Sequence, residues 1–337
     1  MRPTAGIDLG GTKVQAVVLD GKGEIAGQGR TQTPTEGGPP DVVAAIAAAL
    51  AEATAAAGTG PGDLDGLGLG SPGQIDQKAG TVAGAANLSG FDDPVPLAEL
   101  VAGATGARHV LLDNDVNVGT LAEHRHGAGR GSDELLAVFA GSGVGGALVL
   151  GGQLRRGWRG AAGEIGHTVV VLGGDRCSCG RLGCMEAYAG RVSFERKARE
   201  AAAAGRPTVL LELMRERGRE RMTSGIIAAA LDAGDELAVE LLDQAVAALA
   251  AAVASAVNLV DVGLVVLGGG LAEKLGDPFS ERVAEAMGPH LFAQPPLVKV
   301  TGATLGDLGG AIGAAELPHD SAHAGHRKHE HGKHHGR

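Results

Sequence analysis

The chain has 337 residues, 20% of them charged, with a formal net charge of −10 and three cysteines. The negative charge argues against a nucleic-acid partner, because such a surface repels phosphates. No run of about eighteen apolar residues lacks a charged or polar interruption, so we expect no membrane span. The N-terminus also lacks the apolar core of a signal peptide. The length suggests about two domains.

The first half of the chain alternates short apolar runs with alanine-rich segments. Glycine breaks separate the first three runs, as in strands joined by tight turns. A proline or an acidic residue lies near the start of two alanine-rich segments, as in helices. In chain order we expect strands 5–9, 13–19 and 24–30, helix 41–57, strand 64–69, helix 96–103, strand 109–112 and helix 116–126.

The second half begins in the same way, with three strands separated by glycines. In chain order we expect strands 135–140, 145–150 and 153–158, helices 192–204 and 235–258, strand 263–267, helix 277–287, strand 297–300 and helix 309–316. The repetition predicts an α/β protein of two similar domains with a cleft between them. We expect a small domain at 1–113, to which a closing helix at about 305–318 returns, and a large domain at 114–304. Residues 319–337 hold seven of the twelve histidines and should form a disordered, solvated tail.

All three cysteines lie close together and follow a histidine. The set His167, Cys177, Cys179 and Cys184 has the spacing H-x9-C-x-C-x4-C. Three thiolates and one imidazole complete a tetrahedral shell for zinc, and a closed shell indicates a structural metal. One disulfide with an odd thiol is the alternative, but clustering in a cysteine-poor chain favours a metal. Reduced cysteines also indicate the cytoplasm.

Two glutamates flank this predicted zinc site. Glu164 lies three residues before His167, and Glu186 lies two residues after Cys184. A metal that fixes the segment 164–186 would therefore also fix both carboxylates. The alternative for each glutamate is a solvated surface charge.

These motifs resemble the signature of the ROK family, which comprises bacterial sugar kinases and sugar-responsive repressors. G-E-I-G-H followed by C-x-C-G-x-x-G-C-x-E is the most specific part, and the resemblance spans about residues 5–316. Five further segments match the family: a first phosphate loop at 8–13, a sugar-side turn at 70–76, a catalytic segment N-D-V-N at 114–117, a second phosphate loop at 141–146 and a nucleotide-side loop at 267–270.

The resemblance implies the actin-like, or hexokinase-like, ATPase fold and an enzyme that phosphorylates the 6-hydroxyl of a hexose with ATP and Mg2+. Glucose is the expected acceptor. N-acetylglucosamine, N-acetylmannosamine and fructose remain alternative acceptors. The glucokinases of the family usually carry a tryptophan after the pair that corresponds to Asn87-Leu88, and here Phe91 stands one place later than that tryptophan. Polyphosphate remains an alternative donor. A repressor is disfavoured because seven residues precede Asp8 and no basic helix pair is present.

A structural ATPase of the same fold is a third hypothesis, but it would have no use for the two glutamates beside a zinc site. A homodimer is the expected assembly.

The resemblance also implies individual roles. Asp115 is expected to be the base that accepts the proton of the attacking hydroxyl, although an aspartate at a helix start can be a plain N-cap. The expected sugar contacts are Gly73, Asn87, Asn114, Asp115, Glu164, His167 and Glu186. The expected contacts to nucleotide and Mg2+ are Asp8, Gly10, Gly11, Thr12, Lys13, Gly141, Ser142, Gly143, Gly269 and Gly270. For Lys13, a simple surface charge is the alternative.

Overall fold

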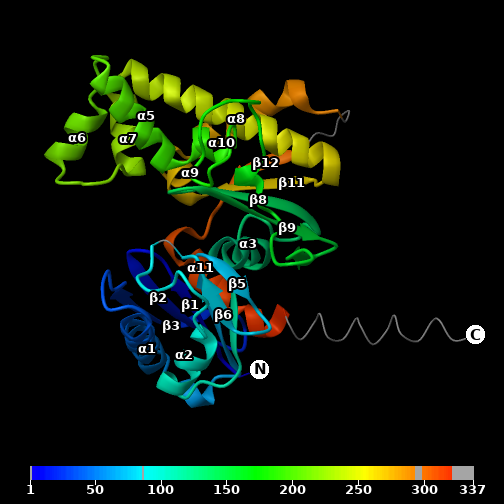
Figure 1. Cartoon of the computed structure of the whole chain (residues 1–337). Helices are drawn as coiled ribbons and strands as arrows, with labels where there is room; N and C mark the ends of the chain where they lie inside the picture. The colour runs from blue at the N-terminus through cyan, green and yellow to red at the C-terminus, as the bar shows by residue number, and fades with distance from the viewer. Residues whose placement is uncertain (1, 86, 293–297, 321–337) are drawn as a thin grey trace, which may run out of the picture. The chain divides into compact units, whose positions relative to one another are not determined.

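The computed structural model describes residues 2–85, 87–292 and 298–320. The chain divides into two compact units (Figure 1). One runs to His126 and resumes at Asp307, and the other is Gly127–Gly306. This division differs from the expected boundary after residue 113, because the helix that follows it belongs to the first unit. Of the expected tail at 319–337, only His319 and Asp320 lie within the described residues.

The first unit is built on a five-stranded sheet. Its elements are β1 (Thr4–Leu9), β2 (Lys13–Leu19), β3 (Ile25–Gln32), α1 (Pro39–Ala56), β4 (Gly66–Ser71), β5 (Gln74–Asp76), β6 (Thr81–Ala83), α2 (Leu97–Thr105), β7 (Val110–Asn114), α3 (Asp115–His126) and α11 (Gly309–Ala315). The strand order is β3-β2-β1-β4-β7. The pairs β1–β2 and β2–β3 are antiparallel, and β1–β4 and β4–β7 are parallel.

The second unit repeats this sheet. Its elements are β8 (Glu134–Ala140), β9 (Val144–Leu150), β10 (Gln153–Arg155), α4 (Glu186–Ala189), α5 (Arg191–Ala203), α6 (Leu210–Glu216), α7 (Ser224–Asp232), α8 (Glu236–Val260), β11 (Leu264–Gly268), α9 (Gly269–Leu275), α10 (Asp277–Met287) and β12 (Lys299–Gly302). The order β10-β9-β8-β11-β12 has the same sequence of antiparallel and parallel pairs. The duplicated sheet confirms the predicted actin-like ATPase fold.

Helix α11 packs very close to the first sheet because the facing surfaces consist of small residues (Figure 1). A Cβ at Gly6 would lie 2.0 Å from the carbonyl oxygen of Ala311, and a Cβ at Gly68 would lie 1.8 Å from that of Ala314. On the other side of α11, a Cβ at Gly313 would lie 1.7 Å from the carbonyl oxygen of Val118 in α3. These contacts hold α3, and therefore its first residue, in a fixed position beside the sheet.

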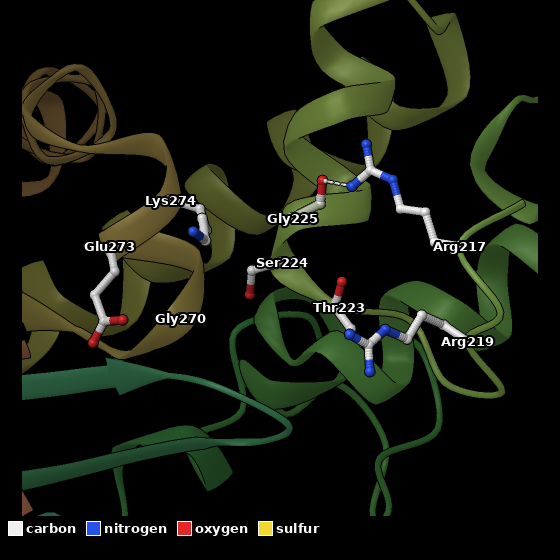
Figure 2. Close-up of a pocket in the computed structure, with 8 residues that line it drawn as sticks. All are labelled: Arg217, Arg219, Thr223, Ser224, Gly225, Gly270, Glu273 and Lys274. Carbon is white, nitrogen blue, oxygen red and sulfur yellow. Dashed lines mark hydrogen bonds between the residues drawn. The ribbon is translucent and has the colours of Figure 1, made fainter. Parts of the chain in front are cut away.

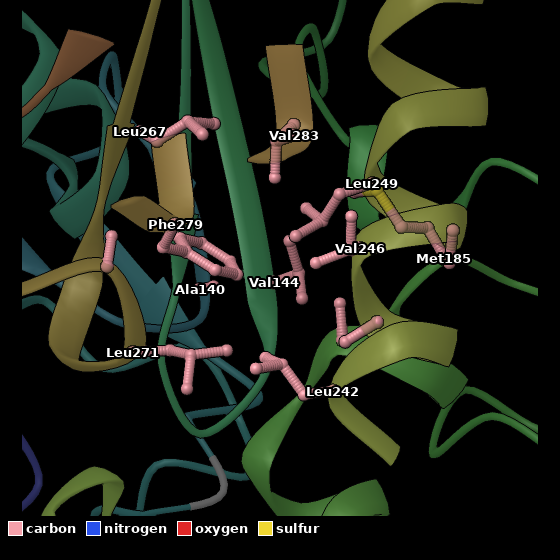
Figure 3. Close-up of a cluster of buried hydrophobic side chains, with 14 of the residues drawn as sticks. Ala140, Val144, Met185, Leu242, Val246, Leu249, Leu267, Leu271, Phe279 and Val283 are labelled. Carbon is pink, nitrogen blue, oxygen red and sulfur yellow. The ribbon is translucent and has the colours of Figure 1, made fainter. Parts of the chain in front are cut away.

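Among the residues that the structure describes, two helices have the length and apolar composition of a membrane span, namely α1 and α8. In α8, 67% of the most apolar window is buried, and in α1 the share is 39%. Figure 3 shows Leu242, Val246 and Leu249 of α8 packed into the same core as Phe279 and Val283 of α10. Core packing therefore accounts for the apolar composition of α8.

Candidate functional site

The predicted site residues fall into two groups, one in each unit. The first unit holds Asp8, Gly10, Gly11, Thr12, Lys13, Gly73, Asn87, Asn114 and Asp115. The second unit holds Gly141, Ser142, Gly143, Glu164, His167, Cys177, Cys179, Cys184, Glu186, Gly269 and Gly270.

Acidic side chains gather at the carboxyl edge of the first sheet, where the parallel strands β1 and β7 end. Asp8 is half-buried near the end of β1, and Asp115 begins α3 directly after β7. Burial, and then the nearby charge of Asp115, raise the pKa of Asp8 to about 6, although Lys13 opposes the shift. Lys13 itself forms an ion pair with Asp307. The edge therefore concentrates negative charge, as a cation site requires.

The last two residues of β7 and the first residue of α3 have separate tasks. Asp113 is buried and accepts hydrogen bonds from the backbone N–H of Asn114 (2.8 Å) and from Nδ2 of Asn117 (2.7 Å). The backbone N–H of Val116 donates to Oδ1 of Asn114 at 3.0 Å, so Asn114 caps α3. The same N–H also donates to Oδ1 of Asp115 at 3.0 Å. Capping of α3 therefore does not depend on Asp115 alone, and the hydrogen bonds of Asp113 stabilise the junction between β7 and α3.

The raised pKa of Asp8 has a consequence for stability. The carboxyl titrates near 3.8 when exposed and at about 6 in the folded protein, so the folded state loses stability as the pH rises from about 4 to about 6 and carries the full penalty above that range. About two pKa units correspond to about 3 kcal/mol. We therefore expect Asp8→Asn to raise the free energy of unfolding by up to about 3 kcal/mol at pH 8 and by little at pH 4.

Denaturant unfolding at the two pH values measures this effect. Asp20→Asn is the control, because the pKa of this exposed carboxyl is lowered by backbone hydrogen bonds from Glu24 and Lys22. Asp20→Asn should not raise the free energy of unfolding at either pH. If Asp8→Asn raised the free energy of unfolding equally at both pH values, or did not raise it at pH 8, this prediction would be wrong.

Hydrogen bonds from within the turn and from Thr33 fix the turn between β1 and β2. The Gly10 N–H donates to the carbonyl of Lys13 at 3.0 Å, and Oγ1 of Thr33 donates to the carbonyl of Gly10 at 2.6 Å. A Cβ at Gly11 would lie 2.9 Å from the Cβ of Asn87. The expected phosphate loop and an expected sugar contact are therefore neighbours within this unit.

Two other predicted residues of the first unit lie in turns. Thr12 is exposed at the tip of the β1–β2 turn. Gly73 has a φ of +94°, and a Cβ there would lie 2.6 Å from the carbonyl oxygen of Ala83. Only glycine fits this turn, so its backbone can approach a ligand closely.

In the second unit, the four predicted metal ligands lie together. His167 Nδ1 and the Sγ atoms of Cys177, Cys179 and Cys184 are all within 4.8 Å of one another. The Cys177 Sγ–His167 Nδ1 and Cys179 Sγ–Cys184 Sγ distances are both 3.8 Å. Around a tetrahedral zinc with bonds of about 2.0–2.3 Å, donor atoms are about 3.5–3.8 Å apart. We call these residues the Cys3His cluster, and its geometry fits zinc.

Charges around the Cys3His cluster affect its thiols unequally. A hydrogen bond from Arg181 (Nε to Sγ, 3.5 Å) is the main cause that lowers the pKa of Cys179 to about 6. Burial raises the pKa of Cys177 to about 12. A metal ion would supply the positive charge that the buried thiolate lacks.

Glu186 connects the Cys3His cluster to the second glycine loop. Its Oε2 accepts the backbone N–H of Val144 at 2.9 Å, and its Oε1 accepts the hydroxyl of Ser178 at 2.6 Å. A Cβ at Gly143 would lie 2.3 Å from Oε2. The carboxylate is thus fixed in place, while Glu164 is exposed. No sequence signal points to Ser178, because it lies between two of the predicted ligands and belongs to no motif of its own.

The second glycine loop connects β8 and β9 and is tied to the start of α5. The carbonyl oxygens of Gly141 and Ser142 accept the backbone N–H groups of Arg191 and Val192, each at 3.1 Å. Gly269 has a φ of +82° and packs against the backbone of Ala140 at the end of β8. The loops at 141–143 and 269–270 therefore lie at the same end of the sheet.

A pocket of about 470 Å3 opens beside the second of these loops (Figure 2). It is lined by Arg217, Arg219, Thr223, Ser224, Gly225, Gly270, Glu273 and Lys274. Figure 2 shows Glu273 and Lys274 on one side, Arg217 and Arg219 on the other, and Ser224 between them. Three cationic side chains and one carboxylate make this pocket suited to an anionic ligand.

Known proteins are similar to this chain over nearly its whole length. The sequence model of the ROK family matches residues 4–321. This chain belongs to the ROK family. The ROK chain is 32% identical to a glucokinase of Thermotoga maritima over 315 residues, which are 93% of this chain and 96% of that protein.

Two solved ROK structures are also similar to this chain over nearly their whole lengths. One is a ROK hexokinase from Thermus thermophilus, with a TM-score of 0.78, 36% identity and coverage of 96% of this chain and 99% of the other. The second is a ROK family glucokinase from Streptomyces griseus in complex with glucose and AMPPNP, with a TM-score of 0.77, 33% identity and coverage of 94% and 98%.

Proposed function

We propose that this ROK protein is an ATP-dependent hexose kinase that converts glucose to glucose 6-phosphate. The observation that carries the proposal is whole-length similarity to a ROK glucokinase that binds glucose and an ATP analogue. The local geometry supports it, because a half-buried aspartate follows β7 and a fixed glutamate adjoins a glycine loop.

The chemistry requires a base at the sugar hydroxyl. We propose that the Asp115 carboxylate accepts the proton of the 6-hydroxyl while that oxygen forms a bond to the γ-phosphorus. The bond between this phosphorus and the oxygen bridging to the β-phosphate then breaks, and ADP leaves. The other proposed sugar contacts are Gly73, Asn87, Asn114, Glu164, His167 and Glu186.

The donor phosphates are assigned to the glycine loops of both units. Asp8 is proposed to orient hydrated Mg2+, which when bound would neutralise charge on the phosphates. The proposed phosphate contacts are Gly10, Gly11, Thr12, Lys13, Gly141, Ser142, Gly143, Gly269 and Gly270. Lys13 would exchange its ion pair with Asp307 for a phosphate.

We propose that the Cys3His cluster holds a structural Zn2+. The Nδ1 atom of His167 faces the sulfur atoms, so its Nε2 atom can contact the sugar. Such a site needs reduced thiols, and for this reason we propose a cytoplasmic location. The expected homodimer stays a prediction that light scattering on the purified protein tests.

A panel of hexoses tests the acceptor. Purified protein with Mg2+ and ATP is given glucose, fructose, N-acetylglucosamine or N-acetylmannosamine, and ADP release is followed. We expect the highest kcat/KM with glucose. A higher value with another sugar would reassign the acceptor, and no sugar-dependent ADP release with any of them would contradict the kinase proposal.

A further inference from the structure

Arg191 is a half-buried cation at the junction of the second glycine loop and the pocket of Figure 2. It is the first residue of α5, and its backbone N–H is bonded to the carbonyl of Gly141. No sequence signal gives it a role, since it lies five residues beyond Glu186 and outside the matched motif. Its backbone position is therefore fixed relative to the loop.

The guanidinium of Arg191 connects two serine hydroxyls. Its Nη2 lies 2.8 Å from Oγ of Ser142 in the glycine loop, and its Nη1 lies 3.4 Å from Oγ of Ser224. Ser224 is buried and lines the pocket, and a Cβ at Gly270 would lie 3.0 Å from the same Oγ. Arg191 thus spans the distance from the pocket to the loop.

Both hydroxyls are neutral, so neither of them offsets the charge of Arg191. Within the described part of the chain, no carboxylate forms a salt bridge with it. Burial, and then the nearby charge of Arg221, lower its pKa, against the weaker influence of Glu195. Glu195 is already engaged by Arg199 at 2.9 Å and by the backbone N–H of Met222 at 2.8 Å.

The remaining cations lie around the same space. Lys274 and Arg219 line the pocket from opposite sides, as Figure 2 shows. A half-buried guanidinium that pairs with no carboxylate among the described residues, next to further cations, is an arrangement that a bound anion would stabilise. A planar guanidinium with several N–H donors matches phosphate oxygens well.

We propose that Arg191 binds the phosphate chain of the nucleotide where that chain runs from the pocket toward Ser142. The inference rests on the proposed function, and it adds a donor-binding residue to it. In this arrangement Ser142 and Ser224 hold the guanidinium in position before the nucleotide arrives. The pocket cations then contact the part of the donor farther from the loop.

The test compares ligands with and without phosphates. Binding of AMPPNP and of adenosine to wild type, Arg191→Gln and Arg191→Lys is measured by calorimetry, and kinetics are measured with glucose. We expect Arg191→Gln to weaken AMPPNP binding by about 10- to 100-fold, the usual scale of a charge-assisted contact. Adenosine binding and the KM for glucose should stay within about twofold of wild type, and Arg191→Lys should recover part of the loss.

Arg206→Gln is the matched control, because this arginine forms a surface ion pair with Glu240 at 2.7 Å. It should change neither binding constant. Equal weakening of AMPPNP and adenosine by Arg191→Gln would indicate a merely structural role and overturn the inference, as would unchanged AMPPNP binding. Nucleotide binding is measured without turnover. A wild-type protein that phosphorylates no hexose would therefore contradict the proposed function without deciding the role of Arg191.

Discussion

Asp115→Asn is expected to lower kcat for hexose phosphorylation by at least ~10²-fold, the usual scale when a general base is lost. The amide cannot accept the proton of the attacking hydroxyl at neutral pH. It can still accept the Val116 N–H at the start of α3, and Asn114 caps the same N–H. The variant should therefore remain folded, hold zinc and bind glucose.

Steady-state kinetics, glucose calorimetry and metal analysis of this variant measure the three expectations. Asp113→Asn is the comparison, because this buried carboxylate supports the segment through Asn114 and Asn117. It should lower the melting temperature more than Asp115→Asn does. Near-normal kcat in Asp115→Asn would show that another group is the base.

Cys184→Ser is expected to release zinc and to weaken glucose binding by at least ~10-fold, on the scale of losing one well-placed charged hydrogen bond. Cys184 is fully buried and lies two residues before Glu186. Without the metal, the segment that positions Glu186 beside Val144 loses its anchor. Elemental analysis and glucose calorimetry measure both effects.

Ser178→Ala distinguishes the effect of losing zinc from the effect of losing one hydrogen bond to Glu186. It removes the 2.6 Å contact to Glu186 Oε1 but no member of the Cys3His cluster. This variant should keep its zinc and bind glucose only a few-fold more weakly, on the scale of one hydrogen bond. A metal-free Cys184→Ser protein with wild-type glucose affinity would contradict the proposed role of zinc.

Local spacing made the Cys3His cluster and the strand pattern predictable. His167 and the cysteines are close in sequence, so one short segment carries the whole donor set. Glycine breaks marked the strands of both sheets, and the duplicated order followed from their repetition. The short elements β5, β6, α4, α6, α7 and α9 were missed, because three to nine residues carry little periodicity.

Contacts between distant residues were not predictable. The partner of Lys13 is Asp307, 294 positions away, and no local pattern indicates that pair. The assignment of α3 to the first unit depends on the close approach of Gly313 to Val118. Arg191 carries no motif signal, and its position became evident only from its two serine contacts.

We expect this chain to transfer a phosphoryl group from ATP to the 6-hydroxyl of glucose. Phosphorus NMR of the zinc-loaded wild-type protein with Mg2+, ATP and glucose follows every phosphorus species in one reaction. We predict that ATP is replaced by equal amounts of ADP and glucose 6-phosphate, and that Asp115→Asn slows this conversion at least ~10²-fold. Persistence of ATP, or its conversion to ADP and inorganic phosphate alone, would contradict this prediction.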